Sequence, residues 1–222
     1  MTVEIKNISK SYGKKQVLRD INLNCSEGKA IAILGSNGCG KSTFFSILAG
    51  IQKGDSGEFL YDNKNLFKDK GDRTSLIGYV PQGTPLFDEL TAYDNLLLWY
   101  DKKELESQLD RGMLKLLKIK EMLKIPVSKM SGGMKKRLSI ACSISKKPRM
   151  LLLDEPMSAL DLACKEEISA YLTDFKNHGG IILIATHDIM ELELCDEYYI
   201  MKDGILEPFL WDGNLTNLVK CL

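Results

Sequence analysis

Apolar and polar residues are arranged along this chain in patterns that predict an α/β fold. Unbroken apolar runs at 30–34, 150–153 and 181–185 are typical of strands that are buried on both faces of a parallel sheet. Apolar residues in every second position at 3–5 and 21–25 predict half-buried strands near the N-terminus. We therefore expect a mainly parallel sheet, preceded by further strands and covered by helices.

Turn and cap signals place the shorter elements. Further strands are expected at 57–61 and 75–80, and a hairpin with an Asp-Gly turn at 198–206. A capping box at 91–94 should open a helix, and a last short helix is expected at 215–222. One more helix should carry an apolar stripe formed by Leu105, Leu109, Met113, Leu116 and Leu117.

A glycine-rich segment directly follows the first buried run. It reads G-x-x-x-x-G-K-S-T and consists of Gly35, Ser36, Asn37, Gly38, Cys39, Gly40, Lys41, Ser42 and Thr43. Such glycines let several backbone N–H groups converge on one anion, and a helix that begins here adds its positive dipole end. Lys41 would then reach the β- and γ-phosphates of a nucleotide, and Ser42 would bind Mg²⁺. An ordinary turn with a solvated lysine is the alternative, but the strand before and Phe44 and Phe45 after favour a phosphate loop.

Two carboxylates end the apolar run at 150–153. If this strand lies next to the phosphate-loop strand, Asp154 faces Mg²⁺, while Glu155 points elsewhere and can polarise a water molecule. A structural ion pair is the alternative. Gln82 and His187 likewise follow strands, and the carboxyl ends of parallel strands meet at one edge of a sheet. We expect them near Asp154, although a solvated amide and a structural histidine are the ordinary explanations.

Two more features are candidate nucleotide contacts. Ser131, Gly132 and Gly133 precede a helix and could form a second anion-binding N-terminus, or simply a capped helix. Tyr12 lies in a short loop before the phosphate loop and could stack on adenine, or be an ordinary surface tyrosine.

Composition narrows the function classes. The formal net charge of zero gives no electrostatic reason to propose nucleic acid as a partner. No apolar run approaches the roughly 18 residues needed to cross a bilayer. The six cysteines lack regular spacing, which argues against a zinc site or a disulfide framework, but Cys39 in the phosphate loop is a candidate for a reactive thiol.

The order of these motifs resembles that of the ATP-binding cassette (ABC) ATPases along nearly the whole chain. In that comparison the segments look like the adenine-stacking aromatic (Tyr12), Walker A (35–43), the Q-loop (Gln82), the signature (131–134), Walker B (151–155), the D-loop (158–161) and the switch histidine (His187). The resemblance implies a P-loop NTPase core, an N-terminal antiparallel β subdomain and an inserted helical subdomain. We expect a single domain over 1–222, with the core and β subdomain at about 1–90 and 147–222 and the helical subdomain at about 91–146.

The resemblance also implies a mechanism that needs two cassettes. They pack head-to-tail as a homodimer or heterodimer, with each ATP between one Walker A and the partner's signature. Val17 joins the expected nucleotide contacts, and Ser42, Gln82 and Asp154 are the expected Mg²⁺ contacts. Lys41 neutralises phosphate charge, Glu155 aligns or deprotonates the attacking water, and His187 contacts the γ-phosphate.

We therefore expect the ATPase subunit of a transporter, cytoplasmic and held on the inner face of the cell membrane by a separate multi-span permease. Its signature has Met130 and Met134 where the family commonly has Leu and Gln, and with the segment at 86–91 this is similar to the drug-export branch. Export is thus the expected direction. The alternatives are an importer ATPase, a soluble ABC ATPase of the iron–sulfur assembly or DNA-repair kind, and a metabolic kinase outside the family.

Overall fold

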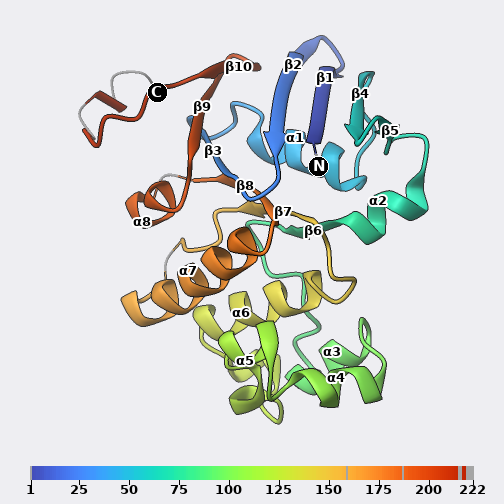
Figure 1. Ribbon diagram of the computed structural model, residues 1–222, viewed down its shortest axis with the longest axis vertical. Coiled ribbons are helices and arrows are strands. Elements are labelled where there is room, and N and C mark those ends of the chain that lie inside the picture. Colours follow the sequence, from blue (N-terminus) through green and yellow to red (C-terminus); the bar gives the residue numbers. More distant parts are fainter. Residues whose placement is uncertain (1, 159, 187, 215–216, 219–222) are drawn as a thin grey trace.

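The strands of the protein form two sheets, and helices cover both faces of the larger one (Figure 1). The structure, a computed structural model, describes residues 2–158, 160–186, 188–214 and 217–218. Most of the helix expected at 215–222 lies outside this range. The two-sheet α/β arrangement with a mainly parallel larger sheet confirms the predicted fold class.

The larger sheet has the strand order β10-β9-β3-β8-β7-β6. Its strands are β3 (Ala30–Leu34), β6 (Ile77–Val80), β7 (Met150–Asp154), β8 (Ile181–Ala185), β9 (Glu197–Lys202) and β10 (Ile205–Pro208). All neighbours pair in parallel except β10, which runs antiparallel to β9. The carboxyl ends of β3, β6, β7 and β8 therefore lie at one edge, where ligand-binding residues gather in such sheets.

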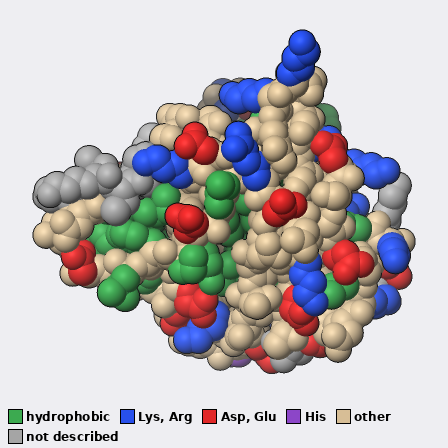
Figure 2. All heavy atoms as spheres, turned by 90° about the horizontal axis from the view of Figure 1, so that it is seen from above, with side chains coloured by type: hydrophobic (Ala, Val, Ile, Leu, Met, Phe, Trp, Pro, Cys, Tyr) green, Lys and Arg blue, Asp and Glu red, His purple; other side chains and the backbone are tan. Residues whose placement is uncertain are grey.

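The smaller sheet is antiparallel and has the order β2-β1-β4-β5. It is built from β1 (Thr2–Tyr12), β2 (Lys15–Ser26), β4 (Ser56–Tyr61) and β5 (Lys64–Asn65). Seen from above, its face carries interspersed acidic and basic side chains (Figure 2). This mixture agrees with the zero net charge of the chain.

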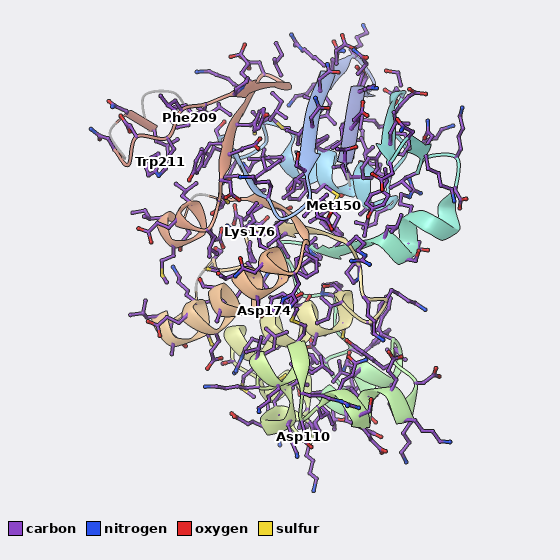
Figure 3. All side chains as sticks on the ribbon, in the orientation of Figure 1. Asp110, Met150, Asp174, Lys176, Phe209 and Trp211 are labelled. Atoms are coloured by element: carbon purple, nitrogen blue, oxygen red, sulfur yellow. The ribbon has the colours of Figure 1, made fainter. Side chains whose placement is uncertain are left out.

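The helices fall into two groups. They are α1 (Lys41–Ala49), α2 (Lys70–Leu76), α3 (Ala92–Leu97), α4 (Lys102–Gln108), α5 (Gly112–Leu116), α6 (Gly132–Ser143), α7 (Leu162–Asn177) and α8 (Ile189–Glu193). Helix α1 lies between the two sheets, whereas α3 to α7 lie on the other side of the larger sheet (Figure 1). Figure 3 places Asp110, next to α4, at the end of the molecule farthest from the smaller sheet, and Met150 near its centre.

The central strands are apolar throughout because each of their faces lines a different core. Ile31 and Ile33 of β3 pack with Phe44 of α1 and with the smaller sheet. Ala32 and Leu34, from the same strand, pack with α6 and α7 on the opposite face. A strand buried on both faces has no polar positions, as the sequence pattern required.

The sequence signals for one helix cap and one hairpin turn predicted the structure correctly. Thr91 and Asp94 form the expected capping box, in which each side chain bonds the other residue's backbone N–H at 3.2 Å. The β9–β10 hairpin turns at Asp203 and Gly204, both with positive φ, as a type I′ turn requires. The proposed division into core and helical subdomain near 91–146 stays a prediction, although α3 to α6 fall inside that stretch.

Three local expectations were wrong. Ser75 and Leu76 belong to α2, and β6 begins only at Ile77, because an apolar pair across a boundary does not mark where the helix ends. The apolar stripe expected for one helix is shared by α4 and α5, because Gly112 adopts a positive φ of 60° and interrupts it. Strand β7 is not next to β3, since β8 lies between them.

No helix in the described part of the chain combines the length and the apolar character needed to cross a bilayer.

Glu191 on α8 is one of several polar side chains buried in the described part of the fold. Its side chain is 1% exposed, and its Oε1 accepts a hydrogen bond of 2.6 Å from the backbone N–H of Met157. Burial raises the pKa of Glu191 to about 7, against the opposing effects of the Thr186 hydroxyl and the Met157 amide. The carboxyl group thus holds the segment after β7 from inside the fold.

We expect Glu191→Gln to flatten the pH dependence of the unfolding free energy between about pH 4.5 and pH 7. In this window the unfolded carboxyl ionises while the folded one keeps its proton, so the wild type loses stability as pH rises and levels off above pH 7. The slope should fall by up to about 1.4 kcal/mol per pH unit relative to wild type. Urea unfolding at pH 5 and 7 measures it. Glu193→Gln, exposed on the same helix, serves as control, and equal slopes for both variants would contradict the assignment.

Candidate functional site

The phosphate loop connects β3 to α1, and its shape depends on glycine. Gly35, Gly38 and Gly40 have φ values of 153°, 80° and 121°. A Cβ on Gly35 would lie 2.4 Å from the carbonyl oxygen of Met201, and one on Gly40 would lie 2.9 Å from Leu18 Cδ2. A side chain at Gly35 would collide with β9, and one at Gly40 would collide with β2. Glycine at these two positions therefore lets the loop pack directly against both strands.

The loop ends in a helix N-terminus that is open to an anion. Gly40 supplies no side-chain cap to α1, and no acidic residue occupies the first turn. The first backbone N–H groups of a helix need partners from outside it, and the dipole favours negative charge. Lys41, only 6% exposed, donates from Nζ to the carbonyls of Gly35 at 2.6 Å and Ser36 at 3.2 Å. Its ammonium group therefore lies over the loop.

A cavity of about 520 Å³ opens beside the loop. Residues of the loop, of β2 and of the β9–β10 turn line it, and they include the cations Lys14, Lys15, Arg19 and Lys202. Val17 also lines it, and the contact of Val17 with a nucleotide stays a prediction. A basic cavity with converging backbone N–H groups suits a polyphosphate.

Tyr12 ends β1 rather than lying in a loop, and it is not among the residues that line this cavity. Its ring is 45% exposed, and Lys10 Nζ lies 5.6 Å from the ring centroid. Stacking of Tyr12 on adenine stays a prediction.

Asp154 and Ser42 come together although their strands are not adjacent. The Ser42 hydroxyl at the start of α1 lies within hydrogen-bonding reach of the Asp154 carboxylate at the end of β7. Burial raises the pKa of Asp154 and Glu155 adds to this, while Ser42, Lys41 and Lys136 oppose it. A hydroxyl and a carboxylate are the hard oxygen ligands that Mg²⁺ prefers, usually together with phosphate oxygens and water.

Within the described residues no group of three or more His, Cys, Asp or Glu side chains could form a complete metal cage. The Ser42 and Asp154 pair fits a magnesium ion that also takes phosphate oxygens and water as ligands.

Gln82 and Glu155 meet at the same edge of the sheet. Gln82 Nε2 donates to Glu155 Oε2 at 2.9 Å. Glu155 has a φ of +49°, and its backbone N–H donates to the carbonyl of Ala185 at 2.9 Å. A positive φ at a non-glycine residue is strained. The two consecutive carboxylates thus contact different partners.

His187 lies outside the described residues, so its placement and its contact with a γ-phosphate stay predictions. The residues on either side of it are ordered by side-chain contacts. The Asp188 N–H donates to Thr186 Oγ1 at 2.8 Å, and Asp188 forms an ion pair with Lys165 of α7.

The signature turn begins α6, which packs on the opposite face of the larger sheet from α1. Ser131 caps α6 by accepting a hydrogen bond of 3.3 Å from the Met134 N–H. Gly132 is exposed, whereas Gly133 is buried so closely that a Cβ would lie 2.3 Å from Cys164 Sγ on α7. Helix α6 lies on the face of the larger sheet that is turned away from α1 (Figure 1). One chain therefore does not bring Ser131 to Gly133 onto its own loop.

Sequence reasoning missed two charged residues of this region, Lys136 and Glu191. Lys136 is 5% exposed, and burial lowers its pKa, opposed first by Asp154 and then by Glu191. Its place in the basic run 135–137 gave no direct sign of burial. The spacing of three and four residues from the buried Gly133 and Ile140 was a usable signal that Lys136 faces inward.

Comparison with known proteins gives consistent results. The sequence profile of the family described as ABC transporter matches residues 18–158. The chain is 32% identical over 218 residues to the sulfate/thiosulfate import ATP-binding protein CysA of Neisseria meningitidis, with 93% of this chain and 60% of the relative covered. It is 36% identical over 213 residues to the spermidine/putrescine import ATP-binding protein PotA of Spiroplasma citri, with 92% and 60% covered. The chain thus spans about 60% of the length of these curated relatives.

A solved structure shares the fold. The dimeric structure of a post-hydrolysis state of the ATP-binding cassette MJ0796, bound to ADP and Pi, superimposes with a TM-score of 0.80. It is 29% identical, and the match covers 94% of this chain and 99% of that one. By its profile match, its fold and the geometry of its phosphate loop, this chain belongs to the ABC transporter family.

Proposed function

We propose that this chain binds and hydrolyses ATP as the nucleotide-binding subunit of an ABC transporter. The observation that carries the proposal is the convergence of three arrangements at one sheet edge: Lys41 over its loop, Ser42 on Asp154, and Gln82 on Glu155. Both relatives are ATP-binding proteins by name, and the similar solved cassette holds ADP and Pi. Both support an ATP site here.

Each residue has a role that follows from its position. Lys41 would leave the loop carbonyls to neutralise the β- and γ-phosphates, as a mobile point charge can. A bound Mg²⁺, held by Ser42 and Asp154, would offset the charge that develops on the phosphates. Glu155 would accept a proton from the attacking water or orient it, and Gln82 holds Glu155 in place for that step. His187 keeps the γ-phosphate role that the family resemblance implies.

We propose further that the working unit contains two cassettes. The signature residues Ser131 to Gly133 form a capped, partly exposed helix N-terminus that their own phosphate loop does not meet. A second cassette could place its loop against this turn and receive the first cassette's loop in return. The related MJ0796 cassette is dimeric, which supports the arrangement. The second cassette would be another copy of this chain or a different one.

A groove of about 530 Å³ suits a helix of the permease. Its walls come from α1, β6, α6 and the end of α3, and they include Ile51, Tyr79, Leu86, Trp99 and Cys142. Ile51 and Trp99 are 71% and 56% exposed, which is unusual for side chains of this size. We assign the groove to an apolar cytoplasmic helix of a multi-span permease, because Pro81, next to Gln82, also lines it. This contact would hold the chain on the inner face of the membrane.

The direction of transport is best proposed as import. Both relatives are import proteins by name, one for sulfate or thiosulfate and the other for spermidine or putrescine. The similarity to the export branch around Met134 receives no support from them. Which solute is moved depends on the permease.

We expect Glu155→Gln to lower steady-state ATP turnover by at least about tenfold, because the amide cannot accept the proton of the attacking water. ATP affinity should stay near the wild-type value, and ATP should drive the variant into a stable dimer. Phosphate release and size-exclusion chromatography with ATP and Mg²⁺ measure both effects. Wild-type turnover in this variant would show that Glu155 has no role in the hydrolytic step, and a monomer at high concentration would count against the paired cassettes.

Bound ATP should slow alkylation of Cys39 by about tenfold or more at saturating nucleotide. Cys39 lies half-buried in the phosphate loop, with its Sγ 3.9 Å from Lys41 Nζ. Mass spectrometry of peptides after timed exposure to iodoacetamide gives the rate, and Cys39→Ser identifies the adduct. Equal rates with and without ATP would place the nucleotide elsewhere.

We expect Trp99→Ser to release the chain from membranes of its own cell, because it removes the largest exposed apolar side chain of the groove. The fraction that sediments with the membranes after a salt wash should fall several-fold, with unchanged ATP turnover. Leu210→Ser is the control, since Leu210 is 88% exposed but does not line the groove. Equal retention of both variants would exclude the groove as the docking site.

A further inference from the structure

Lys136 is a buried cation that no step of hydrolysis yet uses. It lies on α6, five residues after Ser131, and only 5% of it is exposed. Its Nζ donates to the carbonyl oxygen of Pro81 at 3.1 Å and to that of Gln82 at 3.2 Å. Burying an ammonium group costs free energy unless it is well hydrogen-bonded, so these bonds hold α6 and the Pro81–Gln82 segment together.

The side chain at this position has to donate hydrogen bonds and does not need to accept any. Both partners are backbone carbonyls, and an ammonium group offers three N–H donors on a flexible stem. Asp154, Glu191 and Glu155 all act on Lys136 as attractive charges, with Asp154 the strongest. Lysine therefore suits this position both by its hydrogen bonds and by its charge.

Gln82 forms hydrogen bonds through both its backbone and its side chain. Lys136 holds its backbone carbonyl, and its side-chain Nε2 holds Glu155 Oε2 at 2.9 Å. A continuous set of contacts thus runs from α6 through Gln82 to the carboxylate proposed to activate water. The signature residue Ser131 begins the same helix, about 7.5 Å along its axis from Lys136.

We propose that Lys136 is a positioning residue for ATP hydrolysis, which fixes the backbone from which Gln82 reaches Glu155. The inference rests on the proposed function of the site. Because Lys136 and Ser131 share one helix, a shift of the signature turn moves the Gln82 backbone with it. The placement of Glu155 thereby depends on what the signature turn contacts.

The test compares Lys136→Met, Lys136→Arg and Lys135→Met in the full chain. Lys136→Met keeps the apolar stem but removes the donors, so we expect kcat to fall by about tenfold while ATP affinity changes by less than about threefold. Lys136→Arg restores charge and donors and should recover most of the turnover. Lys135, on the same helix but paired with Asp88 at 2.9 Å, is the matched control and should keep wild-type kcat.

A double-mutant cycle with Gln82→Ala separates positioning from general stability. If Lys136 acts through the Gln82 side chain, Lys136→Met should add less than about twofold to the loss in kcat already caused by Gln82→Ala. If the losses in kcat of the two single variants multiply in the double variant, Lys136 has a purely structural role and the inference is overturned. The same holds if Lys136→Met lowers ATP affinity and kcat equally and Lys136→Arg restores neither.

Two outcomes keep this test distinct from that of the proposed function. A wild-type chain without ATP turnover refutes the proposed function itself, whereas normal turnover in Lys136→Met refutes only the role of Lys136. If Lys136→Met does not fold, Lys136→Gln takes its place, because its shorter amide keeps a donor but loses reach and charge. We expect kcat of Lys136→Gln to fall by about threefold with unchanged ATP affinity, and an unchanged kcat overturns the inference.

Discussion

The close approach of the phosphate loop to β2 and β9 is the constraint on which the rest of the site depends. Gly35 and Gly40 leave no room for a Cβ against Met201 and Leu18, and Gly204 at the β9–β10 turn would place one 2.5 Å from the Val17 carbonyl. The Arg19 N–H also donates to the Gly204 carbonyl at 2.7 Å. The smaller sheet, the hairpin and the loop are therefore locked together, and this fixes where α1 begins and where Lys41 and Ser42 point.

Much of this arrangement could be predicted from sequence because its determinants are local. The buried strands are unbroken apolar runs, since both of their faces line a core, and the phosphate loop is defined by glycines at fixed spacing. The meeting of Gln82 with Glu155 also followed from a general rule, because the ends of parallel strands share one edge. For these features, local chemistry and global fold agree.

Other features depend on contacts that no local pattern encodes. The insertion of β8 between β3 and β7 is a choice of strand order, and the apolar runs of all three strands look alike. The end of α2 at Leu76 was hidden because apolar residues continue into β6. The burial of Lys136 depends on two carbonyls 54 and 55 residues away in sequence. The positive φ of Glu155 likewise has no signal in its own residue type.

Several residues that break local rules lie near one edge of the larger sheet. Glu155 adopts a strained backbone, Asp154 and Glu191 are buried acids with raised pKa, and Lys136 is a buried cation among them. Each would cost stability alone, but together the charges oppose one another in a region of low dielectric constant. Since paired buried charges seldom stabilise more than apolar packing would, stability does not explain this cluster. The proposed function does, because it requires the oxygens of Glu155 and Asp154 to stay at fixed positions beside the end of the phosphate loop.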